Sequence, residues 1–127
     1  MIEEKVKAAI RDIKDFPKKG IVFKDITPIL SDPALTTEIT DALAENYAKL
    51  NIDAVMGIES RGFLWGILLP QKLNVPFIPV RKKGKLPYKT VSHKYDLEYG
   101  SAEIEVHEDA IEAGSSILIH DDLLATG

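Results

Sequence analysis

The feature that most constrains this chain is a short aliphatic run that stops at two adjacent carboxylates. Residues 117–119 are aliphatic, Asp121 and Asp122 follow one position later, and Ala, Thr and Gly occupy the last three positions. Such a run predicts a buried strand that ends at a binding loop, because two neighbouring carboxylates repel each other and a packed interior would not accept them. Open parallel sheets bind ligands at the carboxyl ends of their strands. We therefore expect a ligand site directly after this strand.

The residue types in this loop indicate the kind of ligand. The carboxylates of Asp121 and Asp122 can accept hydrogen bonds from a vicinal diol such as that of ribose. Ala125, Thr126 and Gly127 offer backbone N–H groups and a hydroxyl, which suit a phosphate group. The two halves of the loop together predict a cradle for a ribose phosphate.

Residues 121–127 closely resemble the phosphoribosyl-pyrophosphate (PRPP) motif of the type I phosphoribosyltransferases, and most of all that of the adenine-specific members. The resemblance implies an α/β fold, an open and mostly parallel twisted sheet with helices on both faces. Two positions depart from the family: His120 replaces an aliphatic residue, and the sequence stops within the phosphate loop. Because the family continues with a helix and further strands, we expect an incompletely covered sheet and weak activity or none for these 127 residues alone.

Size and composition exclude several classes of protein. A chain of 127 residues predicts a single domain over 1–127, with an N-terminal part at 1–32, a core at 33–127 and a flexible lid at about 82–99. The net charge of −4 disfavours a general nucleic-acid binder. There is no cysteine, no run long enough to span a bilayer and no signal-like apolar segment, so we expect a cytoplasmic protein without membrane or nucleic-acid partners.

The N-terminal residues predict a helix followed by an extended segment. Apolar residues at positions 2, 6, 10 and 13 recur at helical spacing and favour an amphipathic helix over 1–14. The extended segment at 21–26 would by itself be an ordinary edge strand, but residues 16–28 resemble the hood segment of the adenine phosphoribosyltransferases. The resemblance implies that the backbone around Val22 and Lys24 binds the adenine edge, while Phe23 lies against the ring.

The central residues predict a helix on a parallel sheet and a cationic loop after each strand. A helix should begin at Pro33 and end near Asn51, and strands are expected at 54–58 and 75–80. An arginine such as Arg61 in a strand-to-helix turn is more often a surface residue, and the cations at 81–85 could simply discourage strand pairing. Matches to the family's pyrophosphate loop and lid entry instead make Arg61, Arg81 and Lys85 our candidates for PRPP contacts.

The polar residues after this cationic cluster predict a mobile lid, a half-exposed strand at 101–107 and a short helical turn at 108–113. In that strand Glu103, Glu105 and His107 are expected on the solvent-exposed face. Glu98 and Tyr99 match the family's lid, where the glutamate is the candidate for proton transfer to the purine and the tyrosine covers the site. A single glutamate before a tyrosine is otherwise a strand-end charge. His93 and His107 lack partners at ligand spacing, so both are expected at the surface, and no structural metal site is predicted.

The resemblance implies the transfer of the phosphoribosyl group of PRPP to adenine, giving AMP and pyrophosphate, with catalytic roles for Glu98, Asp121 and Asp122. Magnesium would bind through PRPP or pyrophosphate with no direct protein ligand, and a homodimer is expected. Three alternatives stay open: an enzyme for another purine, a PRPP-binding regulatory module without turnover, and a nucleotide-dependent oxidoreductase. The last is disfavoured because no G-x-G-x-x-G follows a strand.

Overall fold

The computed structural model describes residues 1–97 and 100–122. The chain divides into two compact units, Met1–Leu43 and Ala44–Gly127, and each is described by itself. No helix in the described ranges is both long and apolar enough to cross a bilayer.

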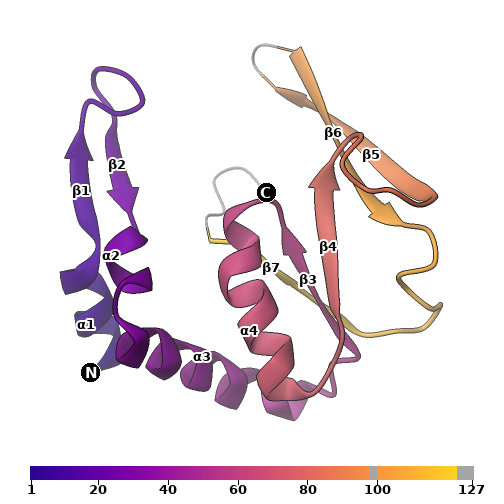
Figure 1. Cartoon of the computed structure of the whole chain (residues 1–127), viewed down its shortest axis with the longest axis horizontal. Helices are drawn as coiled ribbons and strands as arrows, with labels where there is room; N and C mark the ends of the chain where they lie inside the picture. Colours follow the sequence, from indigo (N-terminus) through magenta and orange to yellow (C-terminus); the bar gives the residue numbers. More distant parts are fainter. Residues whose placement is uncertain (98–99, 123–127) are drawn as a thin grey trace. The chain divides into compact units, whose positions relative to one another are not determined.

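The N-terminal unit contains two short helices, a two-stranded sheet and the beginning of a longer helix. Its elements are α1 (Ile2–Ala9), β1 (Arg11–Lys14), β2 (Val22–Asp25), α2 (Thr27–Leu30) and α3 (Pro33–Tyr47), which continues into the second unit. Figure 1 shows β1 and β2 as an antiparallel hairpin in indigo and violet. The predicted strand is confirmed as β2, whereas α2 was not predicted.

The predicted helix over residues 1–14 is wrong beyond Ala9. Ile10 is already extended, and Arg11 to Lys14 pair with β2. Two ion pairs between directly opposed residues stabilise this hairpin: Arg11 Nη2 lies 2.7 Å from Asp25 Oδ2, and Lys24 Nζ lies 2.6 Å from Asp12 Oδ1. Because cross-strand partners are distant in sequence, the local helical spacing of the isoleucines could not reveal them.

Asp25 joins β2 to α2. Its Oδ1 accepts hydrogen bonds from the backbone N–H and the hydroxyl of Thr27, at 2.9 and 2.7 Å. These two bonds from Thr27, together with the Arg11 guanidinium, lower the pKa of Asp25 to about 2. The carboxylate therefore stays ionised and holds the turn that starts the helix.

The predicted helix at Pro33 is confirmed. Asp32 Oδ1 accepts the backbone N–H of Leu35 at 3.1 Å, which satisfies one of the free donors at the start of α3. The helical segment closes with a 3₁₀ turn at Ala48–Leu50, after which Asn51 takes a left-handed conformation with φ of 49°. The turn expected at Asn51 is therefore also confirmed.

The second unit is built on a five-stranded mixed sheet. Its strands are β3 (Ala54–Ile58), β4 (Phe77–Lys82), β5 (Thr90–Leu97), β6 (Gly100–His107) and β7 (Ile117–His120), in the spatial order β5-β6-β4-β3-β7. β3 is parallel to both β4 and β7, while β6 is antiparallel to β4 and β5. The α/β class is as predicted, but a hairpin supplies the antiparallel half of the sheet.

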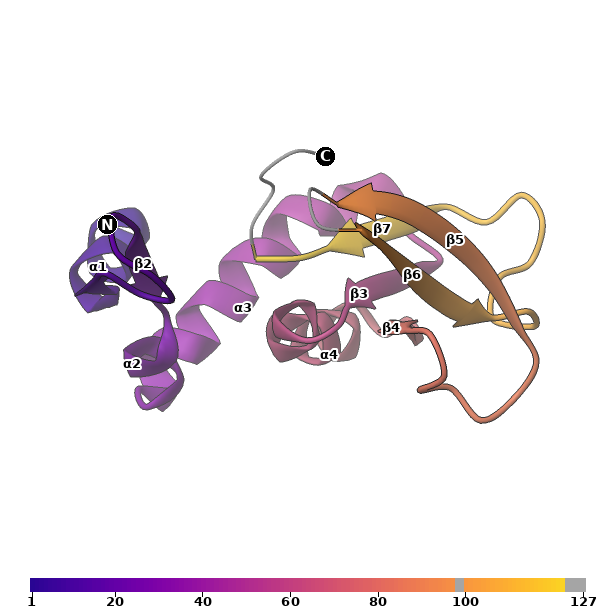
Figure 2. The same ribbon diagram turned by 90° about the horizontal axis from the view of Figure 1, so that it is seen from above.

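The helix α4 (Leu64–Leu73) packs on one face of this sheet against β3 and β4, as Figure 2 shows. Val55 and Leu69 are fully buried at this contact, and Trp65 is 8% exposed. On the other face, Met56, Val80 and neighbouring apolar side chains line a shallow groove of about 270 Å³. The prediction of an incompletely covered sheet agrees with this open face.

Two predictions for the residues around the expected lid need correction. The expected lid itself, at about 82–99, contains β5, which pairs with β6 along its whole length. Residues 108–113 form hydrogen-bonded turns instead of a helical turn. His107 is half-buried beside the ring of Tyr88, whereas His93 is exposed as expected. A neighbouring strand covers one side of β6, which periodicity within one strand cannot show.

Candidate functional site at the carboxyl end of the parallel strands

The loops that follow β3, β4 and β7 meet at one edge of the sheet. Because these three strands are parallel, their carboxyl ends point the same way (Figure 1). Arg61 follows β3, Arg81 lies near the end of β4, and Asp121 and Asp122 directly follow β7. Both aspartates are exposed as whole residues, so the sequence-based expectation that the acid pair projects from a strand end is confirmed.

Arg61 and Asp122 form an ion pair across the edge, with Nε 3.0 Å from Oδ2. The Asp122 side chain is 19% exposed and that of Arg61 is 42% exposed. A guanidinium and a carboxylate predicted to serve one ligand therefore contact each other directly. A pair that is open to solvent on one side can exchange its partner for a charged ligand at moderate cost.

Two glycines allow the loops to approach this closely. A Cβ added to Gly62 would lie 2.8 Å from the carbonyl oxygen of His120 and 3.2 Å from Asp121 Oδ1. A Cβ added to Gly57 would lie 2.6 Å from the carbonyl oxygen of Gly62. The backbone after β3 thus packs against the backbone at the end of β7, which a side chain would prevent.

Two ionisable groups at the end of β7, His120 and Asp122, have a pKa shifted toward the neutral form. Desolvation raises the pKa of Asp122, and the adjacent Asp121 adds to the rise, while the Arg61 guanidinium partly offsets it. Desolvation also lowers the pKa of His120, against an opposing effect of the two aspartates. His120 follows the alternation of β7 onto the face that α4 covers, since Ile119 points to the opposite face and is 64% exposed.

A second pair links the loop after β3 to the end of β4. Glu59 Oε1 accepts hydrogen bonds from Arg81 Nε at 3.2 Å and from the backbone N–H of Lys82 at 3.0 Å. The Glu59–Ser60 peptide bond is cis. The sequence alone assigns no role to Glu59. A carboxylate in the first position after a buried parallel strand, beside a cationic neighbour strand, is the signal that could have identified it.

Lys85 lies in the turn after β4, exposed to solvent. Its backbone N–H donates to the carbonyl of Lys82 at 3.2 Å, and the N–H of Gly84 donates to Glu105 Oε1 at 2.7 Å. The hydroxyl of Thr90 donates to the other carboxylate oxygen of Glu105 at 2.5 Å. Glu105, which is expected on a solvent-exposed face, therefore binds both the turn at Gly84 and the first residue of β5, Thr90.

The adenine-binding candidates lie in the other compact unit. Val22 is 52% exposed, and Phe23 packs edge-on against Phe16 with ring centroids 5.1 Å apart. Lys24 uses its side chain in the ion pair with Asp12. As β2 belongs to a two-stranded sheet, one edge of its backbone is not used for pairing with β1. Such an edge can present N–H and C=O groups to a planar base.

Several predicted site residues lie outside the described ranges: Glu98, Tyr99, Ala125, Thr126 and Gly127. Within residues 1–97 and 100–122, no three His, Cys, Asp or Glu side chains are grouped so that they could hold a metal ion. The described edge therefore consists of two cation–carboxylate pairs and an additional exposed aspartate.

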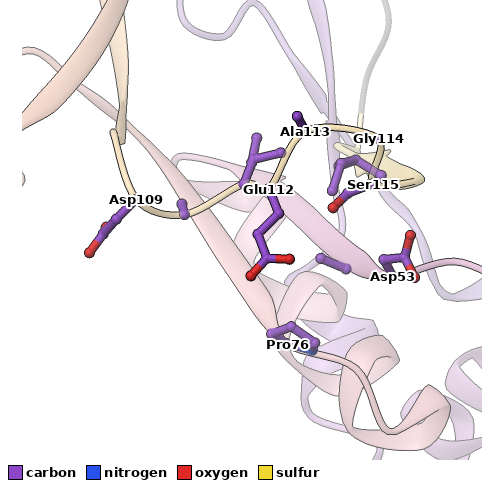
Figure 3. A pocket seen from close by; sticks show the side chains of 11 residues that line it. Asp53, Pro76, Asp109, Glu112, Ala113, Gly114 and Ser115 are labelled. Atoms are coloured by element: carbon purple, nitrogen blue, oxygen red, sulfur yellow. The ribbon is translucent and has the colours of Figure 1, made fainter.

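A cavity of about 440 Å³ lies at the opposite, amino-terminal end of the parallel strands. Figure 3 shows three carboxylates around it, those of Asp53, Asp109 and Glu112. Asp53 Oδ2 accepts the backbone N–H of Ser116 at 2.8 Å, which joins the entries to β3 and β7. No described cation pairs with Asp109 or Glu112, so this cavity lacks the alternating charges of the carboxyl end.

Comparison with known proteins identifies related sequences and structures. The family model for the phosphoribosyl transferase domain matches residues 25–127. An adenine phosphoribosyltransferase of Cytophaga hutchinsonii is 50% identical over 127 residues, which cover all of this chain and 70% of that protein. The crystal structure of adenine phosphoribosyltransferase from Thermoanaerobacter pseudethanolicus superposes with a TM-score of 0.93 at 49% identity, covering all of this chain and 73% of the other.

A third similar protein is the Saccharomyces cerevisiae adenine phosphoribosyltransferase, solved in complex with an imino-altritol bisphosphate and adenine. Its TM-score is 0.92 at 42% identity, covering 99% of this chain and 74% of the other.

Proposed function

The chain belongs to the phosphoribosyltransferase family, and from this premise we infer that it transfers the 5-phosphoribosyl group of PRPP to adenine, giving AMP and pyrophosphate. It is a pentosyltransferase of purine salvage. The match of both sequence and structure to adenine phosphoribosyltransferases extends over the whole chain, and this favours adenine over another purine base.

The Arg61–Asp122 pair is the observation that best supports a mechanism. As the anomeric bond of PRPP breaks, positive charge grows on the ribose ring and negative charge grows on the departing pyrophosphate. Asp121 and Asp122 would accept hydrogen bonds from the ribose hydroxyls and stabilise the cationic ring. Arg61, 3.0 Å from Asp122, would then exchange part of this contact for the oxygens of pyrophosphate. The two aspartates would thus lie beside the developing positive charge on ribose, and Arg61 would lie beside the developing negative charge on pyrophosphate.

The remaining cations extend the proposed diphosphate site. Arg81 and Lys85 would bind further phosphate oxygens from the end of β4 and its turn. Magnesium would enter as part of the substrate, bound through PRPP or pyrophosphate, as the family resemblance implies. It would neutralise the leaving group, while the chain's own cations orient it. The backbone of Ala125, Thr126 and Gly127 would hold the 5-phosphate.

We propose the hood residues Val22, Phe23 and Lys24 as the adenine site. The exposed backbone edge of β2 would read the donor and acceptor pattern of the base, and Phe23 would contact its face. A base held in a fixed orientation loses less entropy when it attacks. Glu98 would transfer a proton to or from the purine and Tyr99 would cover it. The hairpin of β5 and β6 would close as a lid that excludes water.

The test is to incubate the purified protein, both as these 127 residues and extended by the helix and strands with which the family continues, with magnesium and PRPP plus adenine, guanine or hypoxanthine. Nucleotide formation and base binding are measured for both versions. We expect AMP from adenine with the extended version, with at least about 100-fold lower turnover for the other two bases, because unpaired polar groups at a base edge are costly. Preference for another base would indicate a sister enzyme. PRPP binding without any nucleotide product would indicate a regulatory module and would contradict the proposed activity.

A homodimer in the cytoplasm completes the proposal. Both properties follow from the family resemblance, and sedimentation together with cell fractionation would test them.

A further inference from the structure

We propose that Glu59 is a positioning residue that orients Arg81 for the diphosphate of PRPP. The inference rests on the proposed function and deepens it, since it concerns how the chain holds one of its phosphate-binding cations. Glu59 is negatively charged and belongs to a loop that should receive a highly charged anion, where a carboxylate is unfavourable unless it serves the cations around it.

Glu59 lies where the parallel ladder between β3 and β4 ends. Its own N–H donates to the carbonyl of Val80 at 2.9 Å, so the ladder extends one residue beyond β3. In a continued parallel ladder, the N–H of Lys82 would next donate to the backbone carbonyl of Glu59. It donates instead to the carboxylate, at 3.0 Å. The Glu59 carboxylate thus replaces its own backbone carbonyl as the acceptor for Lys82 and is held against the end of β4.

The same carboxylate oxygen binds Arg81 through Nε, at 3.2 Å. Glu59 is the only side-chain partner of Arg81 within residues 1–97 and 100–122, so in this part of the chain the terminal nitrogens of the guanidinium have no described contact. Holding an arginine by its inner nitrogen leaves its two outer nitrogens for a bidentate contact with phosphate. The Arg81 side chain is 34% exposed and that of Glu59 is 15% exposed, so the outer end faces solvent while the anchor is covered.

The charge of Glu59 is stabilised by the groups that it holds. The backbone N–H of Lys82 lowers the pKa of Glu59 most, and Arg81 and Lys85 lower it further. A carboxylate with a lowered pKa is a weaker general base, so a geometric role suits Glu59 better than proton transfer. Its remaining function is geometric: it keeps the guanidinium extended along β4 instead of letting it sample many rotamers.

The test measures Michaelis constants and magnesium-pyrophosphate affinity by calorimetry for wild type, Glu59→Ala, Glu59→Gln, Arg81→Ala and the double variant Glu59→Ala/Arg81→Ala. Loss of a charge-assisted bond should raise the KM for PRPP about 10-fold in Glu59→Ala, and about 5-fold in Glu59→Gln, which keeps an oxygen acceptor. The KM for adenine should stay within about twofold of the wild type, because base recognition does not involve this carboxylate.

The double variant separates positioning from general stability. If Glu59 acts through Arg81, Glu59→Ala should add less than about twofold to the effect of Arg81→Ala, whereas independent roles would multiply. Glu103→Ala is the matched control, since Glu103 contacts Lys83 of the same turn at 3.6 Å but neither arginine. It should leave the PRPP and pyrophosphate constants unchanged. If Glu59→Ala does not fold, Glu59→Gln and its combination with Arg81→Ala provide the same comparison.

The outcomes distinguish the two levels of inference. Normal pyrophosphate binding by both Glu59 variants would overturn the positioning role while leaving the proposed function intact. A multiplicative effect in the double variant, or an equal rise in the KM for adenine, would also overturn it. Absence of PRPP and pyrophosphate binding in the wild type would remove both the proposed function and the inference that rests on it.

Discussion

The two ends of the parallel strands of this sheet carry similar numbers of carboxylates but use them differently. At the carboxyl end, Glu59 and Asp122 each contact an arginine, and glycine backbones bring the loops together. At the amino end, Asp109 and Glu112 line a cavity of about 440 Å³ without a described cationic partner, and Asp53 binds backbone.

The comparison indicates that paired charges of both signs, and not the presence of a cavity, favour one end of the sheet for the proposed chemistry. A transfer reaction that separates charge needs fixed groups of both signs, and only the carboxyl end supplies them in the described part of the chain. The amino end instead holds strands together and tolerates solvated acids. Substitutions at the two ends should therefore affect different measurements.

Asp122→Ala should have the largest effect. Removing the carboxylate eliminates a predicted contact to ribose and leaves Arg61 without its 3.0 Å partner, so turnover should fall by about 100-fold or more, with weaker PRPP binding. Steady-state kinetics and calorimetry would measure this change. Asp109→Ala, at the amino end, is the control and should stay within about twofold of the wild type. Unchanged PRPP affinity in Asp122→Ala would break the distinction between the two ends.

Gly62→Ala should come next. The added methyl would lie 2.8 Å from the His120 carbonyl oxygen. Because both the methyl-bearing residue and this oxygen belong to the backbone, relieving the clash requires the two loops to move apart. We expect a loss of stability of about 1–3 kcal/mol and roughly 10-fold lower turnover. Gly66→Ala in α4 is the matched control, because its methyl would come closest to the side chain of Phe77, at 3.1 Å, and the nearest backbone atom outside α4, the Cα of Gly57, would lie at an ordinary contact distance of 3.6 Å. Thermal unfolding and kinetics would compare them, and equal losses in both variants would contradict a special role for the loop contact.

Asp53→Ala should separate stability from activity. The backbone N–H of Ser116 would lose its acceptor at 2.8 Å, which should lower the free energy of unfolding by about 0.5–1.5 kcal/mol. Because this bond lies at the amino end, the KM for PRPP should not change. Denaturant unfolding and kinetics of the same preparation would test both statements. A raised KM for PRPP with unchanged stability would reverse the proposed assignment of the two ends.

His120→Leu should have the smallest effect, visible only in the pH dependence of stability. Desolvation lowers the pKa of His120 in the folded state below its ordinary value. The unfolded chain then binds the proton more readily, so the stability from neutral His120 is complete above the unfolded pKa of about 6.5 and decreases as the pH falls below it. Between pH 7.5 and 5.5, wild type should lose more stability than His120→Leu in denaturant titrations. Parallel losses would show that His120 is solvated.

Much of the second unit was predictable because its signals are local. The strand at 54–58 is a continuous apolar run, and Asp121 and Asp122 directly follow an aliphatic strand, so their exposure at a strand end could be inferred without a partner. The cap at Asp32 and the turn at Asn51 depend on residue chemistry within a few positions.

The errors arose where distant residues decided the outcome. The helix predicted over 1–14 ended early because Arg11 and Asp12 pair with charges on β2. Glu105 was expected on an exposed face but binds Gly84 and Thr90 of another segment. In both cases the energy comes from contacts between segments separated in the chain, which periodicity within one segment does not record.

The sequence was sufficient to predict the α/β class, the family resemblance and the sheet edge that carries the acid pair. The strand pattern and the residue types that follow each strand are local features of the sequence. Only the tertiary structure decided which charges meet. Arg61 could be proposed for phosphate from the sequence, but its 3.0 Å contact with Asp122 could not. This contact, and the two hydrogen bonds that Glu59 accepts from Arg81 and Lys82, depend on the order of the strands. They also depend on the close approach of the backbone at Gly57 and Gly62. Electrostatic interaction depends on distance in space, and folding sets that distance.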